Sequence, residues 1–155
     1  MNATIEKFVN DKNIALIGVS IVKQKFGNFL MTELAKKGYT IFPVHPTLKE
    51  VNGMKCYADI NELPDQVTNL ILVVQPTVTE QIVSHLKGSS IKRVWMHKGA
   101  GKGTASPAAI KICKDLGIEV VYGFCPMMFF SRSGMHSIHF WLRKKFGEVP
   151  AEFAK

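Results

Sequence analysis

The residues best suited to bind an anion lie in a glycine-bounded segment near the start of the chain. The segment reads Gly18-Val19-Ser20-Ile21-Val22-Lys23-Gln24-Lys25-Phe26-Gly27-Asn28. Glycines let the backbone turn tightly and approach a ligand, and a serine hydroxyl and two lysines stand between them. A helical pattern follows, and helix N-termini bind phosphate groups. The segment therefore predicts a phosphate-binding loop, with a plain turn carrying solvated lysines as the alternative.

A second glycine-rich segment, residues 97–103, follows a later apolar run and reads His97-Lys98-Gly99-Ala100-Gly101-Lys102-Gly103. No acidic residue occurs between Lys87 and Lys114, and the whole chain has a formal net charge of +8. Such a charge favours nucleic acid, an acidic membrane surface or a phosphorylated small molecule as a partner. The charge alone does not choose among them.

Apolar runs alternate with helical patterns along the chain. The runs expected to form strands are residues 14–17, 40–44, 70–74, 94–96 and 119–122. Because parallel neighbours need a crossover, this alternation predicts an α/β fold with a Rossmann-like, doubly wound, five-stranded parallel sheet and flanking helices. We expect the strand order 3-2-1-4-5, in which a ligand crevice lies between the carboxyl ends of the first and fourth strands.

The length of 155 residues is typical of one domain. All five expected strands fall within residues 1–130. A helical pattern over residues 135–146 places Ile138, Trp141 and Leu142 on one face. We therefore expect residues 131–155 to form a C-terminal helical extension packed on the same domain.

The chain lacks the usual signature of a dinucleotide-binding protein. No G-x-G-x-x-G pattern occurs, and the second expected strand ends in Val44-His45-Pro46, with no carboxylate before Glu50. NAD-binding proteins place an acid there to accept the ribose hydroxyls. A ligand with a phosphorylated ribose is therefore favoured, and both NADP and coenzyme A (CoA) qualify.

Several segments in order resemble the small stand-alone CoA-binding proteins, which are similar to the N-terminal domain of the succinyl-CoA synthetase alpha subunit and of ADP-forming acyl-CoA synthetases. They cover roughly residues 13–126. The matching segments are residues 14–20, Lys25-Phe26-Gly27-Asn28, residues 38–46, Gly53-Met54-Lys55-Cys56-Tyr57, Val73-Val74-Gln75-Pro76 and residues 117–126.

The resemblance implies that CoA or an acyl-CoA is the ligand and assigns residues to its parts. Gly18, Ser20, Lys25 and Gly27 would hold the phosphates, with Val19, Lys23 and Phe26 in the same segment. His45 and Pro46 would lie beside the adenosine, Val74, Gln75 and Pro76 along the nucleotide slot, and Lys98 and Gly99 near the pantetheine arm. His45, Gln75 and Lys98 depart from the usual family residues. The synthetases carry their phosphorylated histidine outside this domain, so we expect no ligase activity and no catalytic residues.

An NADP-dependent oxidoreductase, or another nucleotide-binding enzyme, is the alternative function. It needs an acid or base, and only His97 and Tyr122 stand in suitable positions. A nucleic-acid-binding accessory protein is the third candidate, based on Arg143-Lys144-Lys145, but no nucleic-acid-binding motif accompanies that run. We therefore expect no nucleic acid partner.

Three further features each have a purely structural and a functional interpretation. Cys125 follows the last expected strand, where its thiol is either simply packed or able to form a mixed disulfide with CoA. His136 and His139 have the spacing of metal ligands on a helix, but no carboxylate or cysteine completes a set, so we expect no metal. The apolar residues 127–130 would cap the core, cover the pantetheine arm or form a homodimer contact.

The sequence also carries information about the cellular compartment. Three cysteines are too few for a disulfide framework, and an odd number cannot all pair within the chain. This favours a reducing environment. No secretory signal and no apolar run of roughly 18 residues is present. We expect a cytoplasmic protein with no membrane partner.

Overall fold

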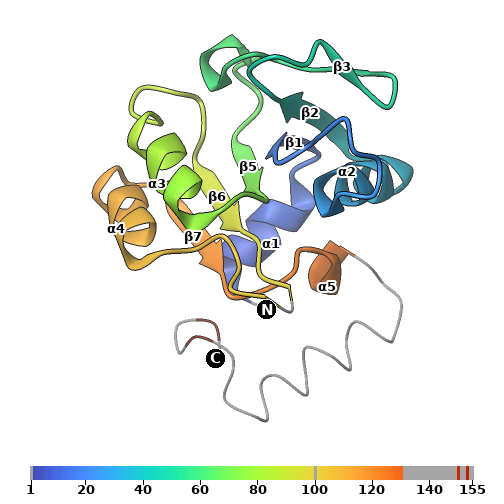
Figure 1. Cartoon of the computed structure of the whole chain (residues 1–155). Coiled ribbons are helices and arrows are strands. Elements are labelled where there is room, and N and C mark those ends of the chain that lie inside the picture. The colour runs from blue at the N-terminus through green and yellow to red at the C-terminus, as the bar shows by residue number, and fades with distance from the viewer. Residues whose placement is uncertain (1, 100, 131–149, 151–152, 154–155) are drawn as a thin grey trace.

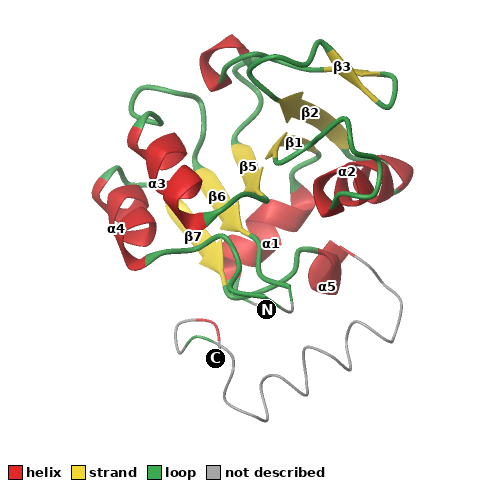
Figure 2. Cartoon of the chain, viewed as in Figure 1, coloured by secondary structure: helices red, strands yellow, loops and turns green. Residues whose placement is uncertain are grey.

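A computed structural model describes residues 2–99, 101–130, 150 and 153. Within them, a parallel five-stranded sheet forms the centre of the molecule (Figures 1 and 2). Its strands are β1 (Asn13–Ile17), β2 (Thr40–Val44), β5 (Asn69–Leu72), β6 (Arg93–Met96) and β7 (Glu119–Tyr122). The expected fold class and all five expected strands are confirmed, although β5 ends at Leu72 and not at Val74.

The observed strand order is β2-β1-β5-β6-β7, so the expected order 3-2-1-4-5 is wrong. The sheet strand that comes third along the chain, β5, pairs with β1 and not with β2, and this leaves β2 at the edge of the sheet. Pro43 explains why, because a proline in a strand lacks the N–H that a central ladder needs. Its carbonyl accepts a hydrogen bond from the Tyr57 amide outside the sheet, which shows that this side of Pro43 faces the outer edge.

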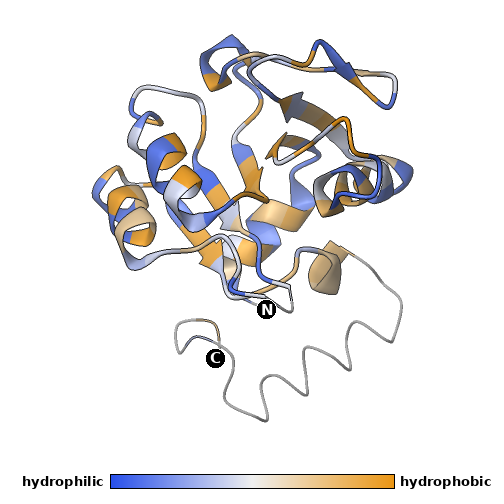
Figure 3. Cartoon of the chain, in the orientation of Figure 1, coloured by the Kyte–Doolittle hydropathy of each residue, from blue (hydrophilic) through white to orange (hydrophobic). Residues whose placement is uncertain are grey.

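Helices cover both faces of the sheet. The helices are α1 (Ala3–Asn10), α2 (Phe26–Lys36), α3 (Pro76–Ser84), α4 (Pro107–Asp115) and α5 (Met127–Phe130), with a 3-10 turn η1 (Ile60–Glu62). A small hairpin of β3 (Glu50–Val51) and β4 (Met54–Lys55) lies between β2 and η1. Both α3 and α4 carry hydrophilic and hydrophobic residues, as expected for amphipathic helices packed on a sheet (Figure 3).

Successive strand residues point to opposite faces, which divides the core in two. On one face Leu16, Ile71 and Trp95 pack with residues of α1, α2 and α5. On the other face Ala15 and Leu70 pack with residues of α3 and α4. The continuous burial of β5 on both faces is typical of a central parallel strand.

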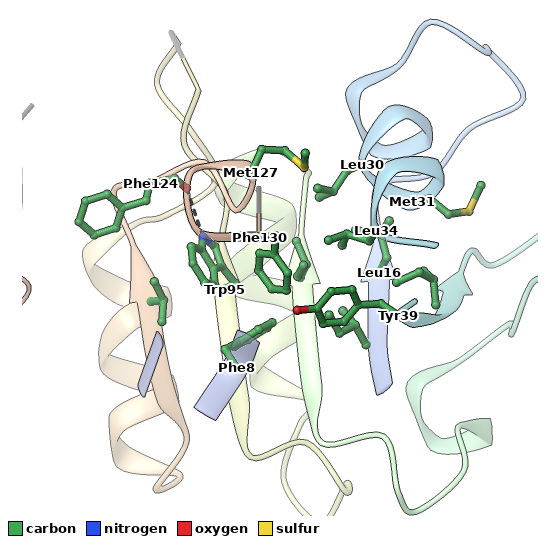
Figure 4. Packing of buried hydrophobic residues seen from close by; sticks show 14 of the residues in the cluster. Phe8, Leu16, Leu30, Met31, Leu34, Tyr39, Trp95, Phe124, Met127 and Phe130 are labelled. Carbon is green, nitrogen blue, oxygen red and sulfur yellow. Dashed lines mark hydrogen bonds between the residues drawn. The ribbon is translucent and has the colours of Figure 1, made fainter. Parts of the chain in front are cut away.

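Trp95 lies in the first core beside Phe8 and Phe130 (Figure 4). Its ring is fully buried and meets the Phe8 ring in a T-shaped contact at a centroid distance of 5.3 Å, and the Phe130 ring lies 5.9 Å away. Its indole N–H donates to the Phe124 carbonyl oxygen at 3.2 Å, which satisfies the one polar atom of the side chain. This bond connects β6 to the segment that follows β7.

The expected helix over residues 135–146 lies outside the described residues, as does most of the expected extension 131–155. Phe153 is described, and its ring is 6% exposed. It contacts the rings of Tyr122 and Phe124 at centroid distances of 5.4 and 5.5 Å. This side chain of the C-terminal segment therefore packs on the β7 end of the sheet.

Candidate functional site

The carboxyl ends of the parallel strands lie at one end of the sheet. The chain adds β2 on one side of β1 and β5 on the other, so the direction of winding reverses between β1 and β5. Ligands of such folds bind at that reversal. The crevice was expected between the first and fourth strands, β1 and β6, and this is wrong because β5 lies between them. The segments after β1, β5 and β6 nevertheless converge there, since residues from all three line one pocket.

The β1–α2 loop, defined here as residues 18–25, begins with a tightly packed backbone. Gly18 has a φ of +120°, and a Cβ there would lie 2.3 Å from the Val73 carbonyl oxygen. A Cβ on Gly27 would lie 2.1 Å from the Gly18 carbonyl oxygen. Both glycines therefore let the first turn of α2 approach the ends of β1 and β5, whether or not a ligand is bound.

The N-terminus of α2 has no side-chain cap. Lys25 is the N-cap residue, and its side chain makes no capping hydrogen bond. The Asn28 and Phe29 amides both donate to the Lys25 carbonyl oxygen. The amides of Phe26 and Gly27 come before them and have no acceptor within the helix. These donors, together with the exposed side chains of Lys23 and Lys25, provide positive potential at this point.

A pocket of about 820 Å³, here called the His97 pocket, opens beside this helix end. Its lining includes Phe26 from α2, Val73, Val74 and Gln75 after β5, and His97, Cys125 and the glycines that follow β6. None of the described residues that line it is an acid, a lysine or an arginine. The pocket therefore suits an uncharged group.

His97 is held in this pocket by its neighbours. Its ring stacks on that of Phe26 with centroids 4.4 Å apart and planes 20° apart. Burial lowers the pKa of His97 from 6.5 to about 4, so the imidazole is neutral at neutral pH. Its Nδ1 is buried and has no hydrogen-bond partner among the described residues.

A second pocket of about 420 Å³, here called the Pro46 pocket, lies at the carboxyl ends of β1 and β2. Ile17, Val44 and Pro46 line one wall, and Asp59 and residues of α3 line the others. Val78 borders both the Pro46 pocket and the His97 pocket, so the two adjoin at the start of α3.

Asp59 is a site residue that the sequence interpretation missed. Its carboxylate accepts hydrogen bonds from the amide and the side chain of Asn61, each at 2.7 Å. The absence of an acid directly after β2 favoured a phosphorylated ribose, yet the chain returns through β4 and brings this acid to the same pocket as Val44. The acid is visible in the sequence, but it stands too far from Val44 along the chain for local patterns to predict that the two share a pocket.

The predicted site residues divide into two groups. Phe26, Val74, Gln75 and Gly99 line the His97 pocket, and Pro46 lines the Pro46 pocket. Others line neither pocket. Their surroundings differ: Val19 is buried in the core, Pro76 is the first residue of α3, and Lys23 borders a separate pocket of about 520 Å³ on the outer side of α2.

Two predicted residues make hydrogen bonds with backbone groups, His45 within its own loop and Lys98 with the segment after β7. The His45 Nδ1 accepts hydrogen bonds from the amides of Thr47 and Leu48, both at 3.2 Å, which turns this ring atom toward its own loop. The Lys98 amide donates to the Phe124 carbonyl oxygen at 3.0 Å, and the Thr104 amide closes the following loop on the His97 carbonyl oxygen at 2.9 Å. These bonds position the glycine-rich loop after β6 beside the His97 pocket.

The remaining predictions concern metals and membranes. Among the described residues no group of three His, Cys, Asp or Glu side chains could hold a metal ion, while His136 and His139 lie outside them. The described helices are all too short or too polar to cross a membrane.

The fold and the crevice define a Rossmann-like α/β domain with a candidate ligand site at the β1/β5 reversal. A family model for the CoA binding domain matches residues 12–131, and the chain belongs to that family. The resemblance inferred from the sequence segments is thereby confirmed.

Curated relatives and solved structures agree with this membership. The chain is similar to the ADP-forming acetate–CoA ligase I of Archaeoglobus fulgidus, with 30% identity over 79 residues, 51% of this chain and only 12% of the ligase. It is also similar to the structure of a hypothetical protein from Pyrococcus horikoshii OT3, with 28% identity, a TM-score of 0.73 and coverage of 83% and 93% of the two chains. A conserved hypothetical protein from Pyrococcus furiosus has 33% identity, a TM-score of 0.67 and coverage of 75% and 97%.

Proposed function

We propose that the protein binds CoA or an acyl-CoA in the crevice and does not ligate it by itself. The observation that carries the proposal is the meeting of three features at one place. The Pro46 pocket and the His97 pocket adjoin at Val78, and Phe26, at the uncapped N-terminus of α2, lines the His97 pocket. An elongated ligand that carries anionic groups as well as uncharged parts would match these three surfaces.

CoA has that pattern of chemistry. Its adenosine would occupy the Pro46 pocket, where Pro46 and Ile17 offer apolar contact and Asp59 offers an acceptor for an amino or hydroxyl group. Its phosphates would face the amides of Phe26 and Gly27 at the uncapped start of α2 and the exposed side chain of Lys25. The pantetheine arm carries no formal charge and would enter the His97 pocket.

The proposal includes no chemical step. His97 is the titratable side chain best placed in the crevice, and no carboxylate among the described residues shares its pocket. A neutral imidazole without an orienting partner contributes packing and one acceptor or donor, which suits binding. The match to the ligase relative covers only 12% of that enzyme, so the ligase activity is not part of the proposal.

Isothermal titration calorimetry with CoA, acetyl-CoA and NADP tests the proposal. We expect CoA and acetyl-CoA to bind, and NADP to bind more weakly because it has no pantetheine arm for the His97 pocket. Native mass spectrometry of the purified protein provides an independent measurement, because a retained ligand identifies itself by mass. Absence of CoA binding at millimolar concentration would contradict the proposal.

A further inference from the structure

We propose that Asn28 is a positioning residue that holds the β1–α2 loop in the conformation required for phosphate binding. This inference rests on the proposed function, because it concerns the phosphates of the same ligand. Asn28 itself is 2% exposed and lies in the first turn of α2, so it acts on the ligand through the loop and not by contact.

The Asn28 side chain binds three backbone groups of the loop. Its Oδ1 accepts from the Ser20 amide at 2.9 Å. Its Nδ2 donates to the carbonyl oxygens of Ser20 and Val22, at 2.7 and 3.2 Å. One buried side-chain amide therefore makes the hydrogen bonds that a regular helix or strand would make within its own backbone. No other side chain of the length of asparagine supplies both an acceptor and two donors.

These bonds decide which backbone atoms remain for an anion. The carbonyl oxygens of Ser20 and Val22 are directed at Asn28, and the Val22 oxygen also accepts from the Lys25 amide at 3.1 Å. Carbonyl oxygens repel phosphate oxygens, so a loop that rotates them toward the crevice would oppose binding. With them held by Asn28, the positive groups nearest the start of α2 are the amides of Phe26 and Gly27.

Val19 anchors the start of the loop in the core and the Lys25–Val22 bond closes its end, but the segment from Ser20 to Val22 has few other restraints. The Ser20 Oγ accepts from the Val22 amide at 3.1 Å, which is a bond within the loop itself. Ile21 and Val22 have exposed side chains, 77% and 46%, and therefore do not hold the loop by burial. Loss of the Asn28 amide would leave the segment from Ser20 to Val22 without its main connection to α2, and we expect it to take several conformations.

The chain offers a matched control in Asn69, which is also a buried asparagine. Asn69 is fully buried, its Nδ2 donates to the Phe8 carbonyl oxygen at 3.3 Å, and it lies at the amino end of β5. The ligand crevice is at the opposite, carboxyl end. Removal of its side chain therefore lowers stability without touching the loop.

The experiment measures CoA affinity and melting temperature for the parent, Asn28→Ala and Asn69→Ala. We expect Asn28→Ala to weaken CoA binding by about tenfold or more, because the loss of buried hydrogen bonds frees the loop. Asn69→Ala should keep the affinity of the parent even if it lowers the melting temperature as much. Hydrogen exchange of the amides of residues 18–25 should become faster in Asn28→Ala and stay unchanged in Asn69→Ala.

Two outcomes overturn the inference while leaving the proposed function intact: equal CoA affinity in Asn28→Ala and the parent, or an equal loss in Asn69→Ala. If the parent itself does not bind CoA, the proposed function fails. If Asn28→Ala does not fold, Asn28→Asp decides. It keeps the acceptor for the Ser20 amide but cannot donate when ionised, so it should also bind CoA more weakly, and parent-like affinity would contradict the proposal.

Discussion

The rings of Phe26 and His97, both in the lining of the His97 pocket, stack on each other with centroids 4.4 Å apart. Phe26 begins α2 after β1, and His97 follows β6, so the pair connects two loops whose strands are separated by β5. The contact also covers one face of the imidazole, which contributes to the burial that keeps His97 neutral. The packing of the site and its electrostatics therefore depend on the same pair of rings.

The first prediction concerns the pH dependence of stability. The pKa of His97 is lowered from 6.5 to about 4 in the folded protein by burial. Between these values the unfolded chain binds a proton that the folded protein does not. The contribution of neutral His97 to the free energy of unfolding is therefore complete above 6.5 and is lost as the pH falls toward 4. In melting curves between about pH 7 and about pH 5, His97→Gln should lose less stability than the parent.

The control for this measurement is His85→Gln, because His85 is exposed at the end of α3. It should retain the pH dependence of the parent. Identical slopes for the parent and His97→Gln would contradict the lowered pKa.

The second prediction concerns the contact between Gly27 and Gly18. Alanine at position 27 places a Cβ 2.1 Å from the Gly18 carbonyl oxygen, a backbone atom that cannot move without displacing the loop or α2. We expect Gly27→Ala to lower the free energy of unfolding by about 2–3 kcal/mol. Gly101→Ala is the control, because a Cβ there meets no atom within 4 Å. Chemical denaturation measures both, and equal stability of the two variants would disprove the close approach.

The third prediction tests the charge at the start of α2. Lys25→Glu places a negative charge beside the proposed phosphate site, and we expect CoA binding to weaken by about tenfold. The melting temperature should change little because Lys25 is exposed and its side chain makes no capping bond.

Lys92→Glu is the matched control for that variant. It changes the net charge by the same amount, but Lys92 lies just before β6, at the amino end of the strands and opposite the crevice. It should bind CoA like the parent. Equal weakening in both variants would mean that the total charge matters and that the position of Lys25 does not.

The fourth prediction distinguishes the three cysteines. Cys113 is fully buried, and burial raises its pKa to about 11; burial also raises the pKa of Cys56, which is 6% exposed. Cys125 is half-buried and lines the His97 pocket. Iodoacetamide should therefore alkylate Cys125 first in the folded protein, and bound CoA should slow the reaction. Peptide mass spectrometry locates the label, and earlier labelling of Cys113 would contradict this order.

Much of this fold can be predicted from the sequence because its signals are local. The alternation of apolar runs with helical patterns is visible in short windows, and it located the strands that became β1, β2, β5, β6 and β7. The sequential resemblance of short segments indicated the CoA binding domain family, which the family model confirms over residues 12–131. Five of the predicted site residues line the two pockets. Four of them, Pro46, Val74, Gln75 and Gly99, come within three residues of the end of a parallel strand, and such residues lie at the same end of the sheet.

The order of the strands is a property of pairing between distant segments, and only the tertiary structure decided it. Pro43 was the one local clue that β2 belongs at an edge. Only the tertiary structure likewise shows that Asp59 reaches the Pro46 pocket and that the ring of Phe26 stacks on that of His97, because both contacts join residues far apart along the chain. Apolar periodicity records which face of an element is buried, but it does not record which other element covers that face. The sequence by itself therefore determined the elements and the family, while the packing of the strands decided where the crevice lies and which side chains share it.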